Sequence, residues 1–502
     1  MLLKSLGTTI VVWAMALIAG SSAAPSAATQ KACEKIELAV PGAVSYRLSL
    51  DYTSEVLSYW SQVPRDLKPA CLVLPKSAEE VAATVRVLND YPDVEFAVKS
   101  GGHDPNPGHA SVADGVLISM KDLKGTTYDE DKGVAYVKPG GEWNDVIGAL
   151  DPQGVAIVGG RLVSGVKGLV GVGGYLLQGG ISFLSSQYGL AADSIVGWET
   201  VNSAGEIVYV DAEKEPELAV AMRGSGSQFG SEAHRPNKGI VTQFTVKTHP
   251  IGQVWGGFRM YGAGKADELY AALHEFVVDN ANDPKQAIIF TDLIAIGELK
   301  LFLIFYFYDG PEPPTSGAFA KFLDIDSTID TTKTQAYSEL TFTIPYVTDA
   351  PHMYSEISGK FTDLLESYIN NPLHLTSQCS VDFQPFPSII GKISQESGGN
   401  ALGISGDDPD RILLEIQCSW AVKGDDEVLT EISDALTKWL EIKVPEWTKG
   451  QHKDLYLPYL MNDAAGDQNV TGMYKDYAKF KALQKKIDPD GFFSIRGGGF
   501  KY

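Results

Sequence analysis

Long apolar runs in the second half of the chain, from Ile251 to about Tyr456, predict strands, and stretches of helical periodicity lie between them. The predicted strands are Gln286–Ile294, Leu299–Tyr308, Ser380–Gln384 and Ile412–Trp420, and helices are predicted over, for example, Ala266–Val278 and Glu427–Leu440. This order indicates a sheet backed by helices.

Shorter elements alternate in the first half. Ser77 and Glu80 form a capping-box pattern ahead of a helix whose apolar stripe contains Val81 and Val85. The β-prone runs around this helix and after it are Leu72–Leu74, Val94–Val98, Gly115–Met120 and Gly133–Val137, and a second helix is predicted over Glu142–Leu150. Alternating short strands and helices indicate an α+β domain.

Two predicted strands of the second half carry polar residues on one face. Reading with a period of two places Asp382 and Gln384 on one face of their strand, and Glu415 and Gln417 on one face of theirs. Cys379 and Cys418 fall on the apolar faces, where a disulfide and two buried free thiols are equally open readings. If the apolar faces pack on helices, the polar faces point toward a ligand; the alternative is that they are solvated strand faces.

Length and charge narrow the class of protein. A chain of 502 residues favours two domains, and a formal net charge of −22 argues against nucleic acid and anionic membranes as partners. Residues 1–23 resemble a secretory signal peptide, because Lys4 precedes a short apolar run and small residues follow it. We therefore expect a secreted or lumenal protein without a membrane span, in which Asn469 begins a glycosylation sequon.

The chemistry is concentrated in glycine-rich segments. The strand ending at Lys99 leads into Ser100, two glycines and His103, and a second segment has seven glycines among positions 159–160 and 171–182. Each glycine costs roughly 0.5–1 kcal/mol in a helix or strand interior, so a compensating contact is required, and a diphosphate on bare main-chain N–H groups supplies one. The spacing matches neither the Rossmann fingerprint nor the Walker loop, and the histidines show no metal-binding spacing.

These segments together resemble the berberine-bridge-enzyme-like flavoproteins of the vanillyl-alcohol-oxidase superfamily. The match continues through Tyr188–Ser194, Thr200–Gly205, Ala221–Gly230, Gly239–Thr242, Tyr459–Ala464 and Asp488–Phe493, so it spans nearly the whole mature chain. The resemblance implies an FAD-binding domain of two subdomains over residues 30–250. It further implies a substrate domain with an antiparallel sheet over 251–455, a C-terminal return to the FAD-binding domain over 456–502, and a Cys33–Cys71 disulfide.

The resemblance also implies the cofactor and its ligands. FAD is expected to be held by a covalent 8α-N bond to His103. The other residues expected to bind it are Lys99, Ser100, Gly101, Gly102, Asp104, Gly108, His109, Val170, Gly171, Gly173, Gly174, Gly179, Gly180, Ser182, Tyr188, Gly189, Ile240, Val241 and Asn462.

Three departures from the family pattern qualify this expectation. Many relatives hold the flavin by a cysteine as well, but no cysteine lies between Cys71 and Cys379, so we predict one bond only. The segment Leu162–Val170 is longer than usual. Ser231–Lys238 interrupts a flavin-contacting segment that relatives run together, as a surface loop or an error in the gene model.

For catalysis we predict a carboxylate that accepts a proton as hydride leaves for the flavin, with Glu415 preferred over Asp382. Tyr459 and Asn462 match the family's C-terminal active-site motif and are the next candidates. Val170, just before the Gly171 segment, is of the type that the family associates with oxygen access.

The expected function is a secreted, monomeric FAD oxidase that oxidises a small-molecule alcohol or amine and passes the electrons to O₂, giving H₂O₂. The alternatives are an oligosaccharide oxidase and a non-redox protein that keeps FAD as a structural ligand and binds or cyclises a metabolite. No metal is expected.

Overall fold

The computed structural model describes residues 24–160, 170–228, 239–279, 282–295, 299–337, 351–369, 371, 378–420, 423–448 and 456–502. The expected signal peptide, most of the long Leu162–Val170 segment and the Ser231–Lys238 interruption lie outside these residues. Within the described chain, no helix combines the length and the apolar character needed to cross a bilayer.

The first half contains two sheets. The four-stranded sheet has the order β1-β2-β4-β3, and the five-stranded sheet has the order β5-β6-β10-β8-β9 with antiparallel neighbours throughout. Their strands are β1 (Val44–Tyr46), β2 (Cys71–Val73), β3 (Phe96–Lys99), β4 (Val116–Ser119), β5 (Thr126–Asp129), β6 (Val134–Val137), β8 (Ile195–Asn202), β9 (Ile207–Asp211) and β10 (Gly239–Lys247). In the first of these sheets β2 and β3 both pair with β4 in parallel.

Helices pack on these sheets. They are α2 (Ala27–Ala39), α3 (Leu50–Leu57), α4 (Gln62–Asp66), α5 (Ala78–Asn89), α6 (Trp143–Leu150), α7 (Val172–Leu177), α8 (Ser185–Tyr188) and α9 (Pro216–Met222). Ser77 caps α5 as the sequence predicts, because its Oγ accepts the Glu80 N–H at 3.3 Å, while the Glu80 carboxylate accepts the Lys76 N–H at 2.6 Å.

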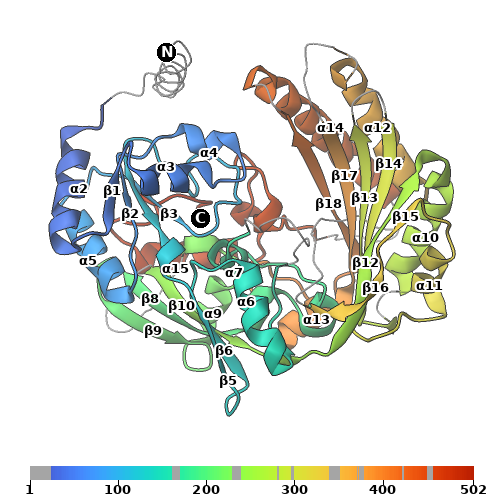
Figure 1. Cartoon of the computed structure of the whole chain (residues 1–502), viewed down its shortest axis with the longest axis horizontal. Coiled ribbons are helices and arrows are strands. Elements are labelled where there is room, and N and C mark those ends of the chain that lie inside the picture. Colours follow the sequence, from blue (N-terminus) through green and yellow to red (C-terminus); the bar gives the residue numbers. More distant parts are fainter. Residues whose placement is uncertain are drawn as a thin grey trace, which may run out of the picture.

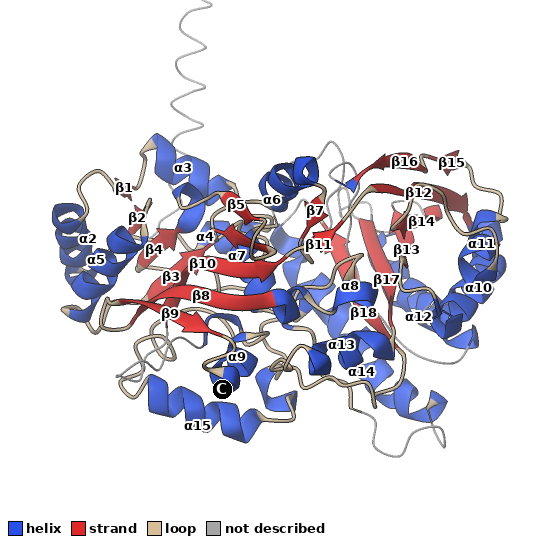
Figure 2. Ribbon diagram, turned by 90° about the horizontal axis from the view of Figure 1, so that it is seen from below, coloured by secondary structure: helices blue, strands red, loops and turns tan. Residues whose placement is uncertain are grey.

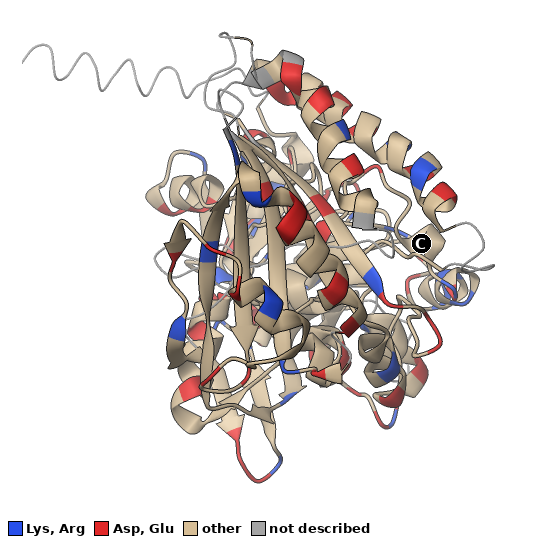
Figure 3. Ribbon diagram, turned by 90° about the vertical axis from the view of Figure 1, so that its right-hand side faces the viewer, with Lys and Arg blue, Asp and Glu red and all other residues tan. Residues whose placement is uncertain are grey.

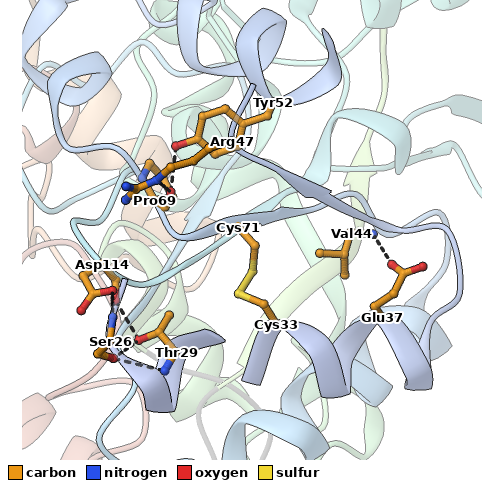
Figure 4. Close-up of a disulfide and its surroundings, with 10 residues drawn as sticks. All are labelled: Ser26, Thr29, Cys33, Glu37, Val44, Arg47, Tyr52, Pro69, Cys71 and Asp114. Carbon is orange, nitrogen blue, oxygen red and sulfur yellow. Dashed lines mark hydrogen bonds between the residues drawn. A yellow bond between two sulfur atoms is a disulfide. The ribbon is translucent and has the colours of Figure 1, made fainter. Parts of the chain in front are cut away.

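A disulfide fastens α2 to β2. Cys33 and Cys71 are bonded, and both are buried in the small core beneath the first sheet (Figure 4). The same figure shows Ser26 and Thr29, at the start of α2, held by Asp114, with the Ser26 N–H 2.9 Å from the carboxylate. The disulfide that the family resemblance implied is therefore present.

The second half is built on a seven-stranded antiparallel sheet. Its order is β15-β12-β14-β13-β17-β18, with β16 also paired to β12. The strands are β12 (Gln253–Gly262), β13 (Gln286–Ala295), β14 (Leu299–Tyr308), β15 (Ile329–Asp330), β16 (Lys333–Ala336), β17 (Gln378–Phe386) and β18 (Arg411–Ser419). The α+β class and the helix-backed antiparallel sheet expected from the sequence are confirmed.

One face of this sheet carries the helices. They are α10 (Ala266–Asp279), α11 (Gly317–Leu323) and α12 (Pro351–Ile369), with α14 (Asp426–Trp447) packed beside α12. Figures 1 and 2 show α10 and α11 on the side away from the first half of the chain. Tyr270 of α10 stacks on Phe290 with ring centroids 5.6 Å apart, and Tyr354 of α12 meets Phe383 at 5.2 Å. In Figure 3, acidic positions are spread along these outer helices, in keeping with the negative net charge.

The last segment of the chain lies against the first half. Helix α15 (Tyr477–Ile487) buries Phe480 and Ile487, and the stretch that follows it reaches back to β3. The Arg496 guanidinium donates to the carbonyls of Leu88, Tyr91 and Val94, each within 3.0 Å. The C-terminus is thereby tied to the same layer that carries the His103 turn.

Candidate functional site

The His103 turn begins where β3 ends. Gly102 has φ +84°, and a Cβ there would stand 2.7 Å from Lys99 Cε and 3.0 Å from Tyr59 Cδ1, so only glycine fits. Solvent reaches the His103 ring. Protein nevertheless surrounds the site closely enough for desolvation to lower the pKa of this imidazole, which Asp104 opposes. The turn therefore presents a neutral imidazole.

The Lys99 side chain points away from that ring. Its ammonium is buried, pairs with Glu55 of α3, and donates to Ser58 Oγ at 2.9 Å. Ser119 Oγ donates to the same Glu55 carboxylate at 2.7 Å. Lys99 thus ties β3 to α3, and any contact that it makes with a cofactor falls to its main chain.

The glycine-rich segment lies directly against the His103 turn. A Cβ on Gly171 would come 2.0 Å from the Gly101 nitrogen, so the two main chains touch. Ser100 Oγ donates to the Pro139 carbonyl at 2.6 Å and accepts the Gly173 N–H at 3.1 Å. Two segments about 70 residues apart in sequence are thereby locked side by side.

Open glycines fit this surface to a diphosphate-bearing cofactor. Gly174, in the first turns of α7, is exposed, and a Cβ built there meets no atom within 4 Å. A phosphate can approach such bare main chain without steric hindrance, which is the reason that anion-binding loops use glycine. Val170, the expected oxygen-access residue, packs half-buried against the core just before this segment.

The far end of the His103 turn is held by the C-terminal tail. His109 Nδ1 lies 2.9 Å from the Asp104 carboxylate, and its ring meets the edge of Phe500 at 4.8 Å. A Cβ on Gly498 would stand 2.0 Å from the His109 carbonyl oxygen and 2.5 Å from that of Gly108. These expected cofactor residues are thus fixed by contacts made 390 residues later in the chain.

Asn462 joins the C-terminal segment to the glycine-rich one. Its Oδ1 accepts the Gly180 N–H at 2.8 Å, and its Nδ2 donates to the Tyr175 carbonyl at 3.4 Å. Gly179 and Gly180 both have positive φ, of +121° and +72°. The amide of Asn462 therefore holds the turn that follows α7.

Ser182 lies where the two halves of the protein meet. It lines a small cavity together with Gln384 of β17. One residue further, Phe183 stacks on Phe307 of β14 with ring centroids 5.1 Å apart. The glycine-rich segment thus abuts the face of the large sheet that the helices leave open.

The remaining expected cofactor residues lie at the end of α8 and in β10, in the first half of the chain. Tyr188 stacks on His249 at 3.7 Å, and Gly189 turns with φ +82°. Burial, with Lys247 nearby, lowers the pKa of His249 to about 4. Ile240 and Val241 are buried in β10.

The candidate carboxylates Asp382 and Glu415 lie opposite each other. They are direct partners in the antiparallel register of β17 and β18, so their side chains share one face. Because Phe383 points to helix α12, its neighbour Asp382 points to the other face, toward the first half of the chain. The two polar strand faces read from the sequence are thus one surface, and it adjoins the glycine-rich segment.

Asp382 and Glu415 differ in burial. Asp382 is fully buried, and this burial raises its pKa to about 7; Asp292 adds to the shift, while Thr291 and Ser380 oppose it. The Ser380 Oγ donates to Oδ2 at 2.8 Å, whereas Oδ1 has no hydrogen-bond partner in the described chain. Glu415 is only half-buried. The environment therefore favours a protonated Asp382 near neutral pH beside a more solvated Glu415.

Tyr459 is half-buried next to Leu460, whose Cδ1 lies 3.1 Å from where a Gly179 Cβ would stand. Burial raises the pKa of the Tyr459 phenol, and Glu441 adds to the shift. Its hydroxyl is therefore protonated at neutral pH.

The same register brings Cys379 opposite Cys418, and the structure bonds them. This settles the alternative left open by the sequence in favour of a disulfide. It closes the open end of the β17 and β18 pair, whose other end is Phe386 opposite Arg411.

Two features of the site were missed from the sequence. Trp60 lies against the His103 ring at 5.3 Å, and only a tertiary contact reveals it. Asp193, buried between the halves, accepts hydrogen bonds from Ser394 and Asn400 at 3.0 and 2.8 Å. The sequence segment that contains Asp193, Tyr188–Ser194, was recognised, but its hydrogen-bond partners lie about 200 residues away and could not be predicted.

Among the described residues, no group of three His, Cys, Asp or Glu side chains is arranged to hold a metal ion.

Comparison with known proteins identifies the cofactor. Residues 69–211 match the family model described as an FAD binding domain. An uncharacterized FAD-linked oxidoreductase of Arthroderma benhamiae is 33% identical, with 97% of this chain and 98% of that protein covered. The FAD-dependent monooxygenase drtC of Aspergillus calidoustus is 30% identical over 90% of this chain and 86% of its own.

The fold has solved counterparts as well. The BBE-like 1 protein of Physcomitrella patens covers 95% of this chain and 100% of its own, with a TM-score of 0.71 and 18% identity. The matched FAD domain contains the His103 turn and the glycine-rich segment, the surfaces that fit a diphosphate here. The chain therefore belongs to the family of fungal FAD-linked oxidoreductases with the berberine-bridge-enzyme-like fold.

Proposed function

We propose that the protein is a secreted oxidase that takes hydride from a small-molecule alcohol or amine and holds FAD by one covalent bond, at His103. The observation that carries the proposal is the contact between the His103 turn and the glycine-rich segment, which brings the turn that carries His103 against bare main chain. The absence of cysteine between Cys71 and Cys379 supports a single bond.

When bound, FAD supplies a ring that accepts two electrons as hydride. The chain supplies the proton acceptor. Glu415 is our first candidate, since it is half-exposed on the face toward the FAD domain, and Asp382 opposite it is the second. Tyr459, with its raised pKa, is suited to donate a hydrogen bond to substrate.

Val170 supports oxygen as the electron acceptor, because valine at this position is the residue type that the family associates with oxygen access. The name of the relative drtC raises a second candidate, a monooxygenase. The two differ in where oxygen goes: an oxidase releases one H₂O₂ per substrate, whereas a monooxygenase places one oxygen atom in the product. Turnover under ¹⁸O₂ with a panel of phenolic, alcohol and amine metabolites, and of oligosaccharides, separates these reactions and the substrate classes.

Secretion is supported by the leader-like first 23 residues and by two disulfides, which persist in oxidising compartments. Asn469 is exposed, as a glycosylation site requires. Mass measurement of protein secreted by a fungal or yeast host, before and after glycosidase treatment, tests both points together. We also propose that the protein acts as a monomer.

The central test is replacement of His103 by alanine. Acid precipitation of wild-type protein is expected to leave the yellow flavin in the pellet, on a peptide that contains His103. The H103A protein should bind FAD but release it to the supernatant. A wild-type supernatant that carries all the flavin contradicts the covalent bond, and a redox-inactive flavin that no candidate substrate bleaches anaerobically favours the structural-ligand alternative.

A further inference from the structure

The residues between α3 and α4, Ser58 to Ser61, form a corner that contacts the His103 turn. Tyr59 is fully buried, and its hydroxyl donates to the Ala110 carbonyl at 2.6 Å. The main-chain N–H of Trp60 donates to the Gly102 carbonyl at 2.9 Å. The corner therefore holds the turn at both ends.

The corner is itself fixed from below. The buried pair of Lys99 and Glu55 fastens β3 to α3, and Arg65 of α4 donates to the Tyr59 carbonyl at 3.1 Å. Ser61 begins α4 by accepting the Val63 N–H at 3.2 Å. These contacts hold the main chain at Trp60, and so fix the point from which its side chain leaves the backbone.

That side chain lies on His103 although it packs into no core. The indole and imidazole centroids are 5.3 Å apart, with the planes tilted by 36°, and 56% of the Trp60 surface is open to solvent. An exposed tryptophan held against one exposed histidine, on a braced corner, restricts that histidine to few orientations.

We propose that Trp60 is a positioning residue that holds the His103 imidazole in the orientation required for attachment to FAD. This inference rests on the proposed single bond to His103. The bond joins an imidazole nitrogen to the 8α methyl carbon of the flavin. One hydrogen leaves each partner, the flavin ring takes up both hydrogens with their two electrons, and O₂ then removes them as H₂O₂.

The reaction needs the nitrogen close to the methyl carbon and aligned with it, so an imidazole that rotates freely is productive for only part of the time. An aromatic pair of ordinary strength biases an orientation roughly two- to tenfold. Loss of the indole should therefore slow attachment by about that factor and leave FAD affinity nearly unchanged.

The test measures attachment directly. Wild-type, Trp60→Ala, Trp60→Leu and Trp60→Phe proteins are produced under riboflavin limitation and mixed with FAD. The fraction of flavin that stays with the acid-precipitated protein is followed in time. We expect Trp60→Phe to remain within twofold of wild type, and Trp60→Ala and Trp60→Leu to be two- to tenfold slower, with unchanged total FAD binding before acid treatment.

Leu50→Ala is the matched control, because Leu50 is 89% exposed at the start of α3, the helix that leads into the corner, and the variant should attach FAD at the wild-type rate. Equal attachment rates for Trp60→Leu, Trp60→Phe and wild type overturn the inference, even if Trp60→Ala fails to fold. A wild-type protein that binds FAD but never attaches it refutes the proposed covalent bond instead, so the two failures are distinguishable.

Discussion

Asp382 shows at the residue scale how burial and position jointly set a chemical state. A carboxyl with no exposure to solvent titrates near pH 7, while its cross-strand partner Glu415 is half-exposed. A carboxyl in the environment of Asp382 is suited to hold a proton near neutral pH. The stability of the protein should report this state without any substrate.

We predict that Asp382→Asn weakens the pH dependence of folding stability. The folded pKa of about 7 lies above the unfolded value near 3.8, so the folded state binds the extra proton. The associated stability is full below the unfolded pKa and is lost as pH rises through 7. The slope of 1.36 kcal/mol per pH unit applies over the roughly two units from pH 5 to the folded pKa. Between pH 5 and pH 8 the wild-type unfolding free energy should therefore fall by about 3 kcal/mol relative to the variant.

Urea unfolding of both proteins at pH 5 and pH 8 measures this difference. Asp363→Asn is a suitable control, because it removes a carboxylate that is exposed to solvent on α12. Parallel pH curves for wild type and Asp382→Asn would show that Asp382 is ionised in the folded protein.

At the scale of the element, helix α7 and the glycines around it are where we propose that FAD binds. Its glycines have different environments, although they look alike in sequence. Gly171 touches the main chain of Gly101, whereas Gly174 borders open space. Packing therefore requires glycine at position 171, whereas it would accept a side chain at position 174.

Alanine at these two positions should separate folding from FAD binding. Gly171→Ala forces a Cβ against backbone and should cost about 1–3 kcal/mol or more of stability. Gly174→Ala should leave the flavin-free protein unchanged or stabilise it by about 0.5–1 kcal/mol, since the position is helical. If the cofactor approaches this main chain, the same change lowers FAD occupancy.

Thermal unfolding of flavin-free protein and the ratio of flavin to protein absorbance measure both effects. Gly148→Ala, in helix α6 with no atom within 4 Å, is the control that should keep full FAD occupancy. Full occupancy in Gly174→Ala would place the cofactor elsewhere.

At the scale of the whole molecule, the two halves share one core. The largest cluster of buried apolar residues runs through both, and Phe183 stacks on Phe307 across the boundary. Asp193 adds hydrogen bonds to Ser394 and Asn400. The halves should therefore unfold together, although each carries its own disulfide.

Removal of the Cys379–Cys418 disulfide tests this coupling. The bond spans 39 positions, so the double serine variant should lose about 2–4 kcal/mol of stability. Calorimetry should show one transition at a lower temperature, and FAD should remain bound. The Cys33→Ser, Cys71→Ser variant, which alters the other half, should shift the same single transition. Two separate transitions would mean that the halves are energetically independent.

The sequence by itself determined the strands and helices whose patterns are local. β14 occupies Leu299–Tyr308 as predicted, and α10 extends the predicted Ala266–Val278 helix by one residue. Ser77 begins helix α5 as the capping pattern predicted, because a helix cap depends only on residues a few positions apart. By contrast, β12 and α12 were not predicted; in β12 two adjacent glycines interrupt the alternation on which strand prediction depends.

The candidate site divides in the same way. The glycines and His103 could be found from the chain, because their residue types carry the signal and the family pattern extends it. Period two assigned Asp382 and Glu415 to faces of separate strands, but only the register placed them opposite each other and bonded Cys379 to Cys418. Three further contacts also came only from the tertiary structure: Trp60 against His103, the ion pair of Lys99 with Glu55, and the hydrogen bond of Asn462 to Gly180. The physical reason is that residue type and local spacing are written in sequence, whereas the choice of neighbour depends on the packing of segments tens to hundreds of residues apart.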